Sequence, residues 1–206
     1  MNREGTSAPV TNLRTLLRSL VLNTEGEEVT VRELINAIGR RAYGPVLLLL
    51  GFIAVSPLTI IPGANWFVST VVLIFSLQIV IGRKTPWLPK GALDFRFRRD
   101  HLVQGARGAE KYAHMVDALV RPRLTFLTEA PFVQLVGLVC VAAALITYPL
   151  GLIPLGPLLP SLAVLLLGLA LTARDGVVVL LAMATLSGAV LIMLRVLPKL
   201  AQLWPF

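Results

Sequence analysis

Residues 130–173 read APFVQLVGLVCVAAALITYPLGLIPLGPLLPSLAVLLLGLALTA, which is 44 consecutive positions without a charged side chain. Two more charge-free runs accompany it, 38 residues at 45–82 and 19 residues at 176–194. A bilayer core takes about 20 consecutive apolar residues per crossing. The three runs exclude a soluble enzyme, a secreted disulfide scaffold and a disordered chain. They predict an all-α, polytopic membrane protein with a final transmembrane helix.

Composition and charge agree with this class. Of the 206 residues, 56% are apolar and 15% are charged, against about 45–50% and about 25% in soluble domains. Much of the net charge of +8 falls in residues 83–129, where the positive-inside rule explains it better than nucleic-acid binding does. We therefore expect a lipid bilayer as partner, with anionic lipids near this basic linker, and no nucleic acid. The single cysteine, Cys140, excludes an intrachain disulfide.

The first apolar run is interrupted at residues 56–65. Pro57 and Pro62 lie five residues apart, and proline removes a backbone donor and clashes with the preceding turn. The run therefore predicts helices of about 12 residues at 45–56 and about 17 residues at 66–82, with a rise of about 1.5 Å per residue. The shorter helix reaches only about 18 Å against a core of about 30 Å, so the run is not two ordinary spanning helices. The hairpin is predicted to be re-entrant or a pair of short crossings.

The second apolar run repeats this plan. Helices are predicted at 132–147 and 161–173, with a break from Tyr148 to Pro157. The segment Pro57-Leu58-Thr59-Ile60-Ile61-Pro62 matches Pro149-Leu150-Gly151-Leu152-Ile153-Pro154 at four of six positions, with an offset of 92. We interpret the two Pro-broken helical hairpins as an internal duplication. Whether the repeats are parallel or inverted stays open.

Paired helix breaks in a membrane chain expose backbone groups that can face an ion or a polar solute. The candidate residues of these core helix breaks are Ser56, Pro57, Thr59, Pro62, Gly63, Asn65, Thr147, Tyr148, Pro149, Pro154 and Ser161. The alternative is that the prolines only kink packed helices and that each hydroxyl bonds within its own helix. Neither run contains an ionisable side chain except Tyr148 and Cys140, which argues against a carboxylate-based proton pump.

Charged residues flank the apolar runs. Interfacial charges are predicted at Arg83, Lys84, Arg121, Arg123, Arg174 and Asp175, where they anchor the topology. No phosphate-binding glycine loop, nucleophile elbow or zinc-protease motif occurs in the sequence. The two histidines, His101 and His114, have no ligand cluster near them in sequence. We expect no enzyme activity, no metal and no cofactor.

The chain divides into five parts. Residues 1–44 form an N-terminal extension with amphipathic interfacial helices, where Thr30 and Glu33 have the spacing of a capping box. The first hairpin occupies 45–82, the basic linker with a helix 83–131, the second hairpin 132–173, and the last transmembrane helix 176–197.

The order of these features resembles the ExoD family of bacterial exopolysaccharide-synthesis proteins. The resemblance covers about residues 28–195 and rests on five patterns: Val29-Thr30-Val31-Arg32-Glu33-Leu34, the break at Pro57, Pro62 and Gly63, Gly82-Arg83-Lys84-Thr85-Pro86-Trp87-Leu88-Pro89, Arg121-Pro122-Arg123-Leu124, and Ala173-Arg174-Asp175-Gly176. It departs at Phe126, where the pattern has a tryptophan. The resemblance implies a multi-pass protein of the bacterial inner membrane that is linked to exopolysaccharide synthesis.

The leading hypothesis is a small transporter-like or ion-coordinating protein centred on the paired breaks. The alternative is a non-transporting accessory or scaffold subunit of a polysaccharide-synthesis complex, with the linker as its docking face. A membrane enzyme acting on a lipid-linked sugar ranks third, because acid–base catalysis needs ionisable groups that the core lacks. A homodimer and contacts with polysaccharide-synthesis proteins are further predictions.

Overall fold

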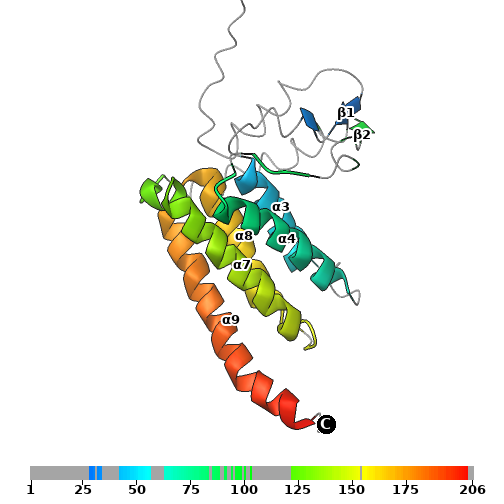
Figure 1. Cartoon of the computed structure of the whole chain (residues 1–206), viewed down its shortest axis with the longest axis vertical. Helices are drawn as coiled ribbons and strands as arrows, with labels where there is room; N and C mark the ends of the chain where they lie inside the picture. The colour runs from blue at the N-terminus through cyan, green and yellow to red at the C-terminus, as the bar shows by residue number, and fades with distance from the viewer. Residues whose placement is uncertain are drawn as a thin grey trace, which may run out of the picture.

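The computed structural model describes most of the helical part of the chain. The described residues are 28–30, 32–33, 42–56, 63–83, 85–88, 91, 94, 96–98, 100, 103, 122–153 and 155–203. Within them lie five α-helices: α3 (Tyr43–Val55), α4 (Ala64–Val80), α7 (Phe132–Leu150), α8 (Leu158–Ala173) and α9 (Gly176–Leu203). A 3₁₀ turn, η3 (Thr125–Thr128), precedes α7. The predicted helical fold is confirmed, and Figure 1 shows the helices packed side by side.

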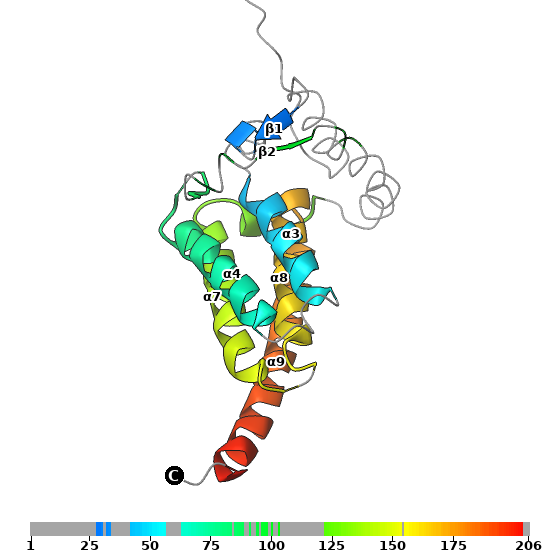
Figure 2. The same cartoon turned by 90° about the vertical axis from the view of Figure 1, so that its right-hand side faces the viewer.

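The helices pair across the two hairpins. The most extensive contacts join α3 to α8 and α4 to α7, and α9 packs mainly on α8. Figure 2 shows α3 and α7 descending from the linker end, and α4 and α8 returning to it. Both hairpins therefore turn at the same end of the bundle, and α9 extends past that end (Figures 1 and 2).

Glycines let the paired helices approach closely. A methyl group added at Gly44 would lie 2.8 Å from the backbone nitrogen of Thr172, and one at Gly51 would lie 2.5 Å from the Cα atom of Leu165. Gly168 packs directly on the backbone of Leu48. Small residues at crossings are the usual basis of helix association in membranes, because close approach maximises van der Waals contact.

Three helix ends lie three or more residues from the predicted positions. The helix expected at 132–147 continues as α7 to Leu150, with Pro149 inside its last turn. Proline costs one backbone hydrogen bond there, but the N–H of Gly151 still donates to the carbonyl of Thr147 at 2.8 Å, so the turn persists. Helix α8 begins at Leu158, before the expected 161, since Pro160 lies in a first turn that needs no N–H. Helix α9 continues to Leu203, beyond 197.

A short antiparallel strand pair lies at the linker end and was not predicted. Strand β1 (Glu28–Thr30) pairs with β2 (Arg96–Arg98), with Val29 opposite Phe97. After β1, the predicted capping box is present: the N–H of Glu33 donates to Thr30 Oγ1 at 3.2 Å, and the N–H of Thr30 donates to Glu33 Oε2 at 3.1 Å. The amphipathic helices expected in residues 1–44 and the helix expected in the linker at 83–131 lie outside the described residues, except for scattered positions.

Two of the described helices are long and apolar enough to cross a bilayer. They are Phe132–Leu150, and Gly176–Arg195 of α9. Helices α3, α4 and α8 are equally apolar in character but have 13, 17 and 16 residues. At about 1.5 Å per residue, α4 and α8 measure about 26 and 24 Å, and α3 measures about 20 Å.

Candidate functional site

The predicted break residues gather at the end of the bundle remote from the linker. Ser56 follows α3, Gly63 caps α4 with a left-handed φ of 89°, and Thr147 to Pro149 form the last turn of α7. Asn65 is in the first turn of α4, and Ser161 is buried in α8. Pro57, Thr59, Pro62 and Pro154 lie outside the described residues.

Two hydroxyls at the breaks bond within their own helices. Ser56 Oγ donates to the carbonyl of Ile53 at 2.7 Å, and Thr147 Oγ1 donates to the carbonyl of Ala143 at 2.8 Å. Ser76 and Thr172, deeper in the bundle, do the same with carbonyls four residues back. A hydroxyl engaged in this way satisfies its own donor without a ligand, which is the alternative that the sequence left open.

Tyr148 connects the two hairpins at this end. Its hydroxyl lies 2.7 Å from Thr70 Oγ1, and its carbonyl accepts the indole N–H of Trp66 at 3.3 Å. A side chain at Gly151 would collide with the Trp66 ring, 2.6 Å from Nε1. The polar atoms here therefore tie α4 to α7.

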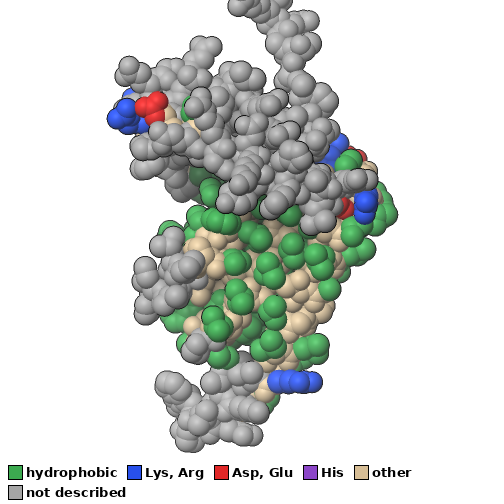
Figure 3. All heavy atoms as spheres, turned by 180° about the vertical axis from the view of Figure 1, so that it is seen from behind, with side chains coloured by type: hydrophobic (Ala, Val, Ile, Leu, Met, Phe, Trp, Pro, Cys, Tyr) green, Lys and Arg blue, Asp and Glu red, His purple; other side chains and the backbone are tan. Residues whose placement is uncertain are grey.

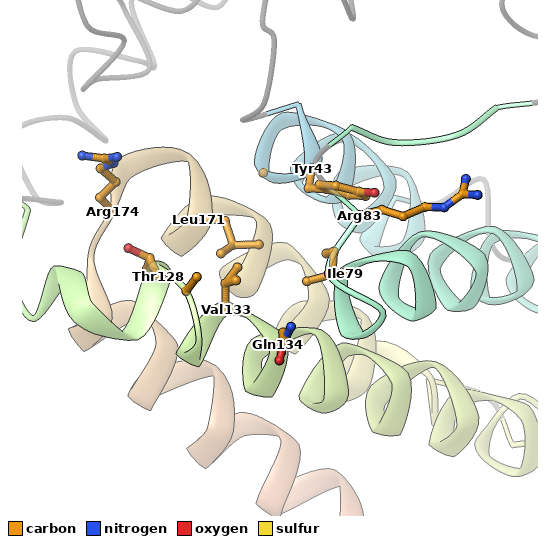
Figure 4. Close-up of a pocket in the computed structure, with 11 residues that line it drawn as sticks. Tyr43, Ile79, Arg83, Thr128, Val133, Gln134, Leu171 and Arg174 are labelled. Carbon is orange, nitrogen blue, oxygen red and sulfur yellow. The ribbon is translucent and has the colours of Figure 1, made fainter.

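A cavity lies at the opposite, linker end of the bundle. Its volume is about 340 Å³, at the lower end of the range of ligand pockets. The starts of α3 and α7 and the ends of α4 and α8 surround it (Figure 4). Ile79, Val133 and Leu171 form apolar lining, and the polar lining residues are Tyr43, Arg83, Thr128, Gln134 and Arg174.

Gln78 holds the linker against the bundle next to this cavity. The buried amide accepts the N–H of Trp87 at 2.5 Å and donates to the carbonyl of the same residue at 3.2 Å. The Tyr43 hydroxyl donates to the carbonyl of Thr85 at 3.0 Å. The segment after α4 therefore folds back over the helix ends through backbone groups.

The predicted interfacial charges fall into different roles. Arg174 takes the left-handed conformation with a φ of 58°, and its guanidinium lies 3.4 Å from the carboxylate of Glu129. Asp175 is buried and accepts the N–H of Val177 at 2.9 Å, which caps α9. The carbonyl of Arg123 accepts the N–H of Gly176 at 2.6 Å. Arg83 is exposed at the cavity mouth, while Lys84 and Arg121 lie outside the described residues, as do His101 and His114.

Comparison with known proteins identifies the family. A profile described as "Exopolysaccharide synthesis, ExoD" matches residues 13–195. The chain belongs to the ExoD family. Protein ExoD of Rhizobium meliloti (strain 1021) is 36% identical to this chain over 170 residues, which cover 82% of the chain and 70% of that protein. No solved structure matches the chain.

Part of the segment 82–89, which carried the family resemblance, lies at the cavity rim. Gly82 and Arg83 line the cavity, Pro86 is buried, and Trp87 is the residue whose backbone Gln78 holds. Gln78 and Gln134 stand out in the sequence as polar side chains near the breaks, but the predicted site did not include them. The available signal was a polar amide within an otherwise apolar helical run, but the partner of such an amide cannot be read from the sequence.

Replacing Gln78 with leucine is expected to destabilise the protein by about 1–3 kcal/mol, because the N–H and carbonyl of Trp87 lose their partner in a part-buried place. Gln78→Glu keeps the acceptor and loses the donor, so we expect an intermediate loss. Thr147→Val is the matched control, since its hydroxyl bonds only within its own helix. Thermal unfolding of the detergent-purified variants ranks their stabilities. Equal stability of Gln78→Leu and Thr147→Val would contradict a clamping role.

Proposed function

We propose that this chain is an integral membrane protein with five crossings, formed by α3, α4, α7, α8 and α9. Large apolar side chains point outward along the helices, including Phe52, Phe67, Leu138, Leu145, Leu180 and Leu191. The space-filling view shows such side chains across the face of the bundle, with charged residues near its ends (Figure 3). Leu152 and Leu155, at the tip of the second hairpin, are 67% and 81% exposed. Apolar exposure on this scale suits lipid better than water.

The strand pair supports an even number of crossings between residues 31 and 95. Strands β1 and β2 hydrogen-bond to each other, so the chain on either side of the first hairpin lies on one face of the membrane. The described arginines also favour that face: Arg32, Arg83, Arg96, Arg98, Arg123 and Arg174 are at the linker end, and Arg195 is at the other end of α9. The positive-inside rule makes the linker face cytoplasmic, in the inner membrane of a bacterium.

An internal duplication with parallel repeats is part of the proposal. The ends of α4 and α8 share one capping geometry: Gly82 and Arg174 are both left-handed, and the N–H groups of Arg83 and Asp175 donate to Gln78 and Ala170 at 3.0 and 3.1 Å. These pairs keep the offset of 92 seen at the prolines.

The helix crossings keep the same offset. Gly168 packs on Leu48, and the side chains of Ser76 and Cys140 meet at the corresponding crossing. Because a swap of the two hairpins exchanges the α3–α8 contact with the α7–α4 contact, the two main interfaces are equivalent under the proposed duplication.

Within the membrane, we propose an accessory role in exopolysaccharide synthesis rather than a conduit. The observation that carries this is the close packing between the hairpins. Gly44, Gly51, Gly137 and Gly168 bring the helices into backbone contact, and the buried hydroxyls of Thr147 and Thr172 bond within their own helices. The cavity described above opens at the linker end, where a partner of the synthesis machinery has access.

A conduit is the second candidate, and one observation favours it. The Tyr148–Thr70 contact and the cavity lie at opposite ends of the same α4–α7 interface. A carrier closed in its middle has this layout, with polar groups at both mouths.

Liposome flux combined with complementation separates the two candidates. We expect reconstituted protein to leave the flux of potassium, sodium, phosphate and protons at the level of empty liposomes, while the same gene restores exopolysaccharide output in a strain that lacks it. A solute-specific flux that disappears in a Pro57→Ala/Pro149→Ala variant with normal insertion would overturn the accessory role in favour of the conduit.

A further inference from the structure

The cavity at the linker end combines an apolar lining with two arginines at its mouth. Figure 4 shows Ile79, Val133 and Leu171 grouped between the helix ends, with Arg83 and Arg174 on opposite sides. Their guanidinium groups point away from the middle of the cavity, on long stems that can turn towards a ligand. The floor is therefore apolar and the rim cationic.

The charges around the mouth leave a cationic surplus. Among the described residues, Arg83 makes no salt bridge, and the guanidinium of Arg174 lies 3.4 Å from the carboxylate of Glu129. The other nearby carboxylate, Asp175, is buried and caps α9. Among the described residues at the mouth, there are thus two guanidinium groups and one accessible carboxylate. Guanidinium is the side chain best suited to bidentate contact with phosphate oxygens.

The helix ends around the cavity also tolerate an anion. Carbonyls at the ends of α4 and α8 would repel one, but those of Gln78 and Ala170 are already bonded to the N–H groups of Arg83 and Asp175. Helices α3 and α7 begin at the cavity, and the positive ends of their dipoles favour a negative group there.

We propose that this cavity binds the headgroup of an anionic phospholipid, with Arg83 and Arg174 on the phosphate and the apolar lining against the adjoining hydrocarbon. The proposal rests on the membrane insertion proposed above, which puts the cavity at the cytoplasmic edge of the bilayer. An apolar floor of this kind offers no hydrogen bonds to a hydrated inorganic ion, whereas it can contact hydrocarbon. This favours lipid over free phosphate as the source of the anion.

Lipid retention by detergent-purified full-length protein tests the proposal. The protein is titrated with phosphatidic acid, phosphatidylglycerol or zwitterionic phosphatidylcholine, and bound lipid is counted by native mass spectrometry. We expect one anionic lipid to bind at least tenfold more tightly than phosphatidylcholine. Arg83→Gln/Arg174→Gln should reduce this preference at least tenfold, and the exposed Arg83→Gln alone should reduce it in part.

Arg96→Gln/Arg98→Gln is the matched control, because it removes the same charge from β2 at a distance from the cavity lining. An equal loss in that variant, or equal binding of phosphatidylcholine by the wild type, would overturn the proposal. Displacement of the lipid by millimolar inorganic phosphate would assign the site to free phosphate instead and overturn its lipid part. Carbonate extraction of native membranes is run separately: release of the chain would refute membrane insertion itself, whatever the lipid titration gives.

Discussion

Replacing Gly168 with alanine is expected to abolish most of the folded protein. A Cβ atom at this position would lie 2.6 Å from the carbonyl carbon of Leu47 and closer still to the backbone nitrogen of Leu48. Backbone atoms cannot turn aside as a flexible side chain does, so α8 must move away from α3. This is the most extensive helix pair in the bundle. We expect the free energy of unfolding to fall by about 3 kcal/mol or more, which is the upper end of ordinary overpacking costs.

Gly188→Ala is the matched control for this substitution. Gly188 is also inside an apolar helix, α9, but an added methyl group there meets only Leu159 Cδ1 at 3.7 Å, an ordinary contact. Alanine is also a better helix former than glycine, so the stability of the Gly188→Ala variant should equal or exceed that of the wild type. Fluorescence-detected size exclusion after heating gives the midpoint for each variant. A Gly168→Ala midpoint within a few degrees of the control would show that α3 and α8 are not in backbone contact.

The two ends of the described bundle are expected to lie on opposite sides of the membrane. Five crossings put β2 in the cytoplasm and the end of α9 in the periplasm. The segment Gly176–Arg195 contains 20 residues, or about 30 Å, which matches the hydrocarbon core. In a Cys140→Ala background, a membrane-impermeant maleimide applied to spheroplasts should label Pro198→Cys and leave Arg98→Cys unlabelled. Inverted vesicles should give the reverse pattern.

Both cysteine positions are exposed, so labelling reports the side of the membrane rather than burial. Labelling after detergent permeabilisation is the control that both thiols react. Labelling of the two positions from the same side would contradict five crossings and would require an even number between β2 and the end of α9. That result would leave the helical packing intact and remove the proposed orientation.

Much of the fold follows from the sequence because its causes are local. The charge-free runs predict apolar helices, and the segment around Pro57 and Pro62 separates α3 from α4, whose observed bounds lie within about two residues of those expected. The capping box of Thr30 and Glu33 is a contact over three residues, and it is present. The family resemblance, carried by short motifs, is confirmed as well.

The tertiary structure decides which helix packs on which, and with it the site. Helices that are apolar on every side have no hydrophobic stripe to indicate a partner, so the sequence could not predict that α3 pairs with α8, or that both hairpins turn at one end. The role of Gln78 depends on Trp87 folding back over the bundle end, and the cavity exists only where four helix ends meet. By itself the sequence determined what forms helices and where they break, since those are short-range effects. The packing determined where polar groups meet, because that depends on residues far apart in the chain.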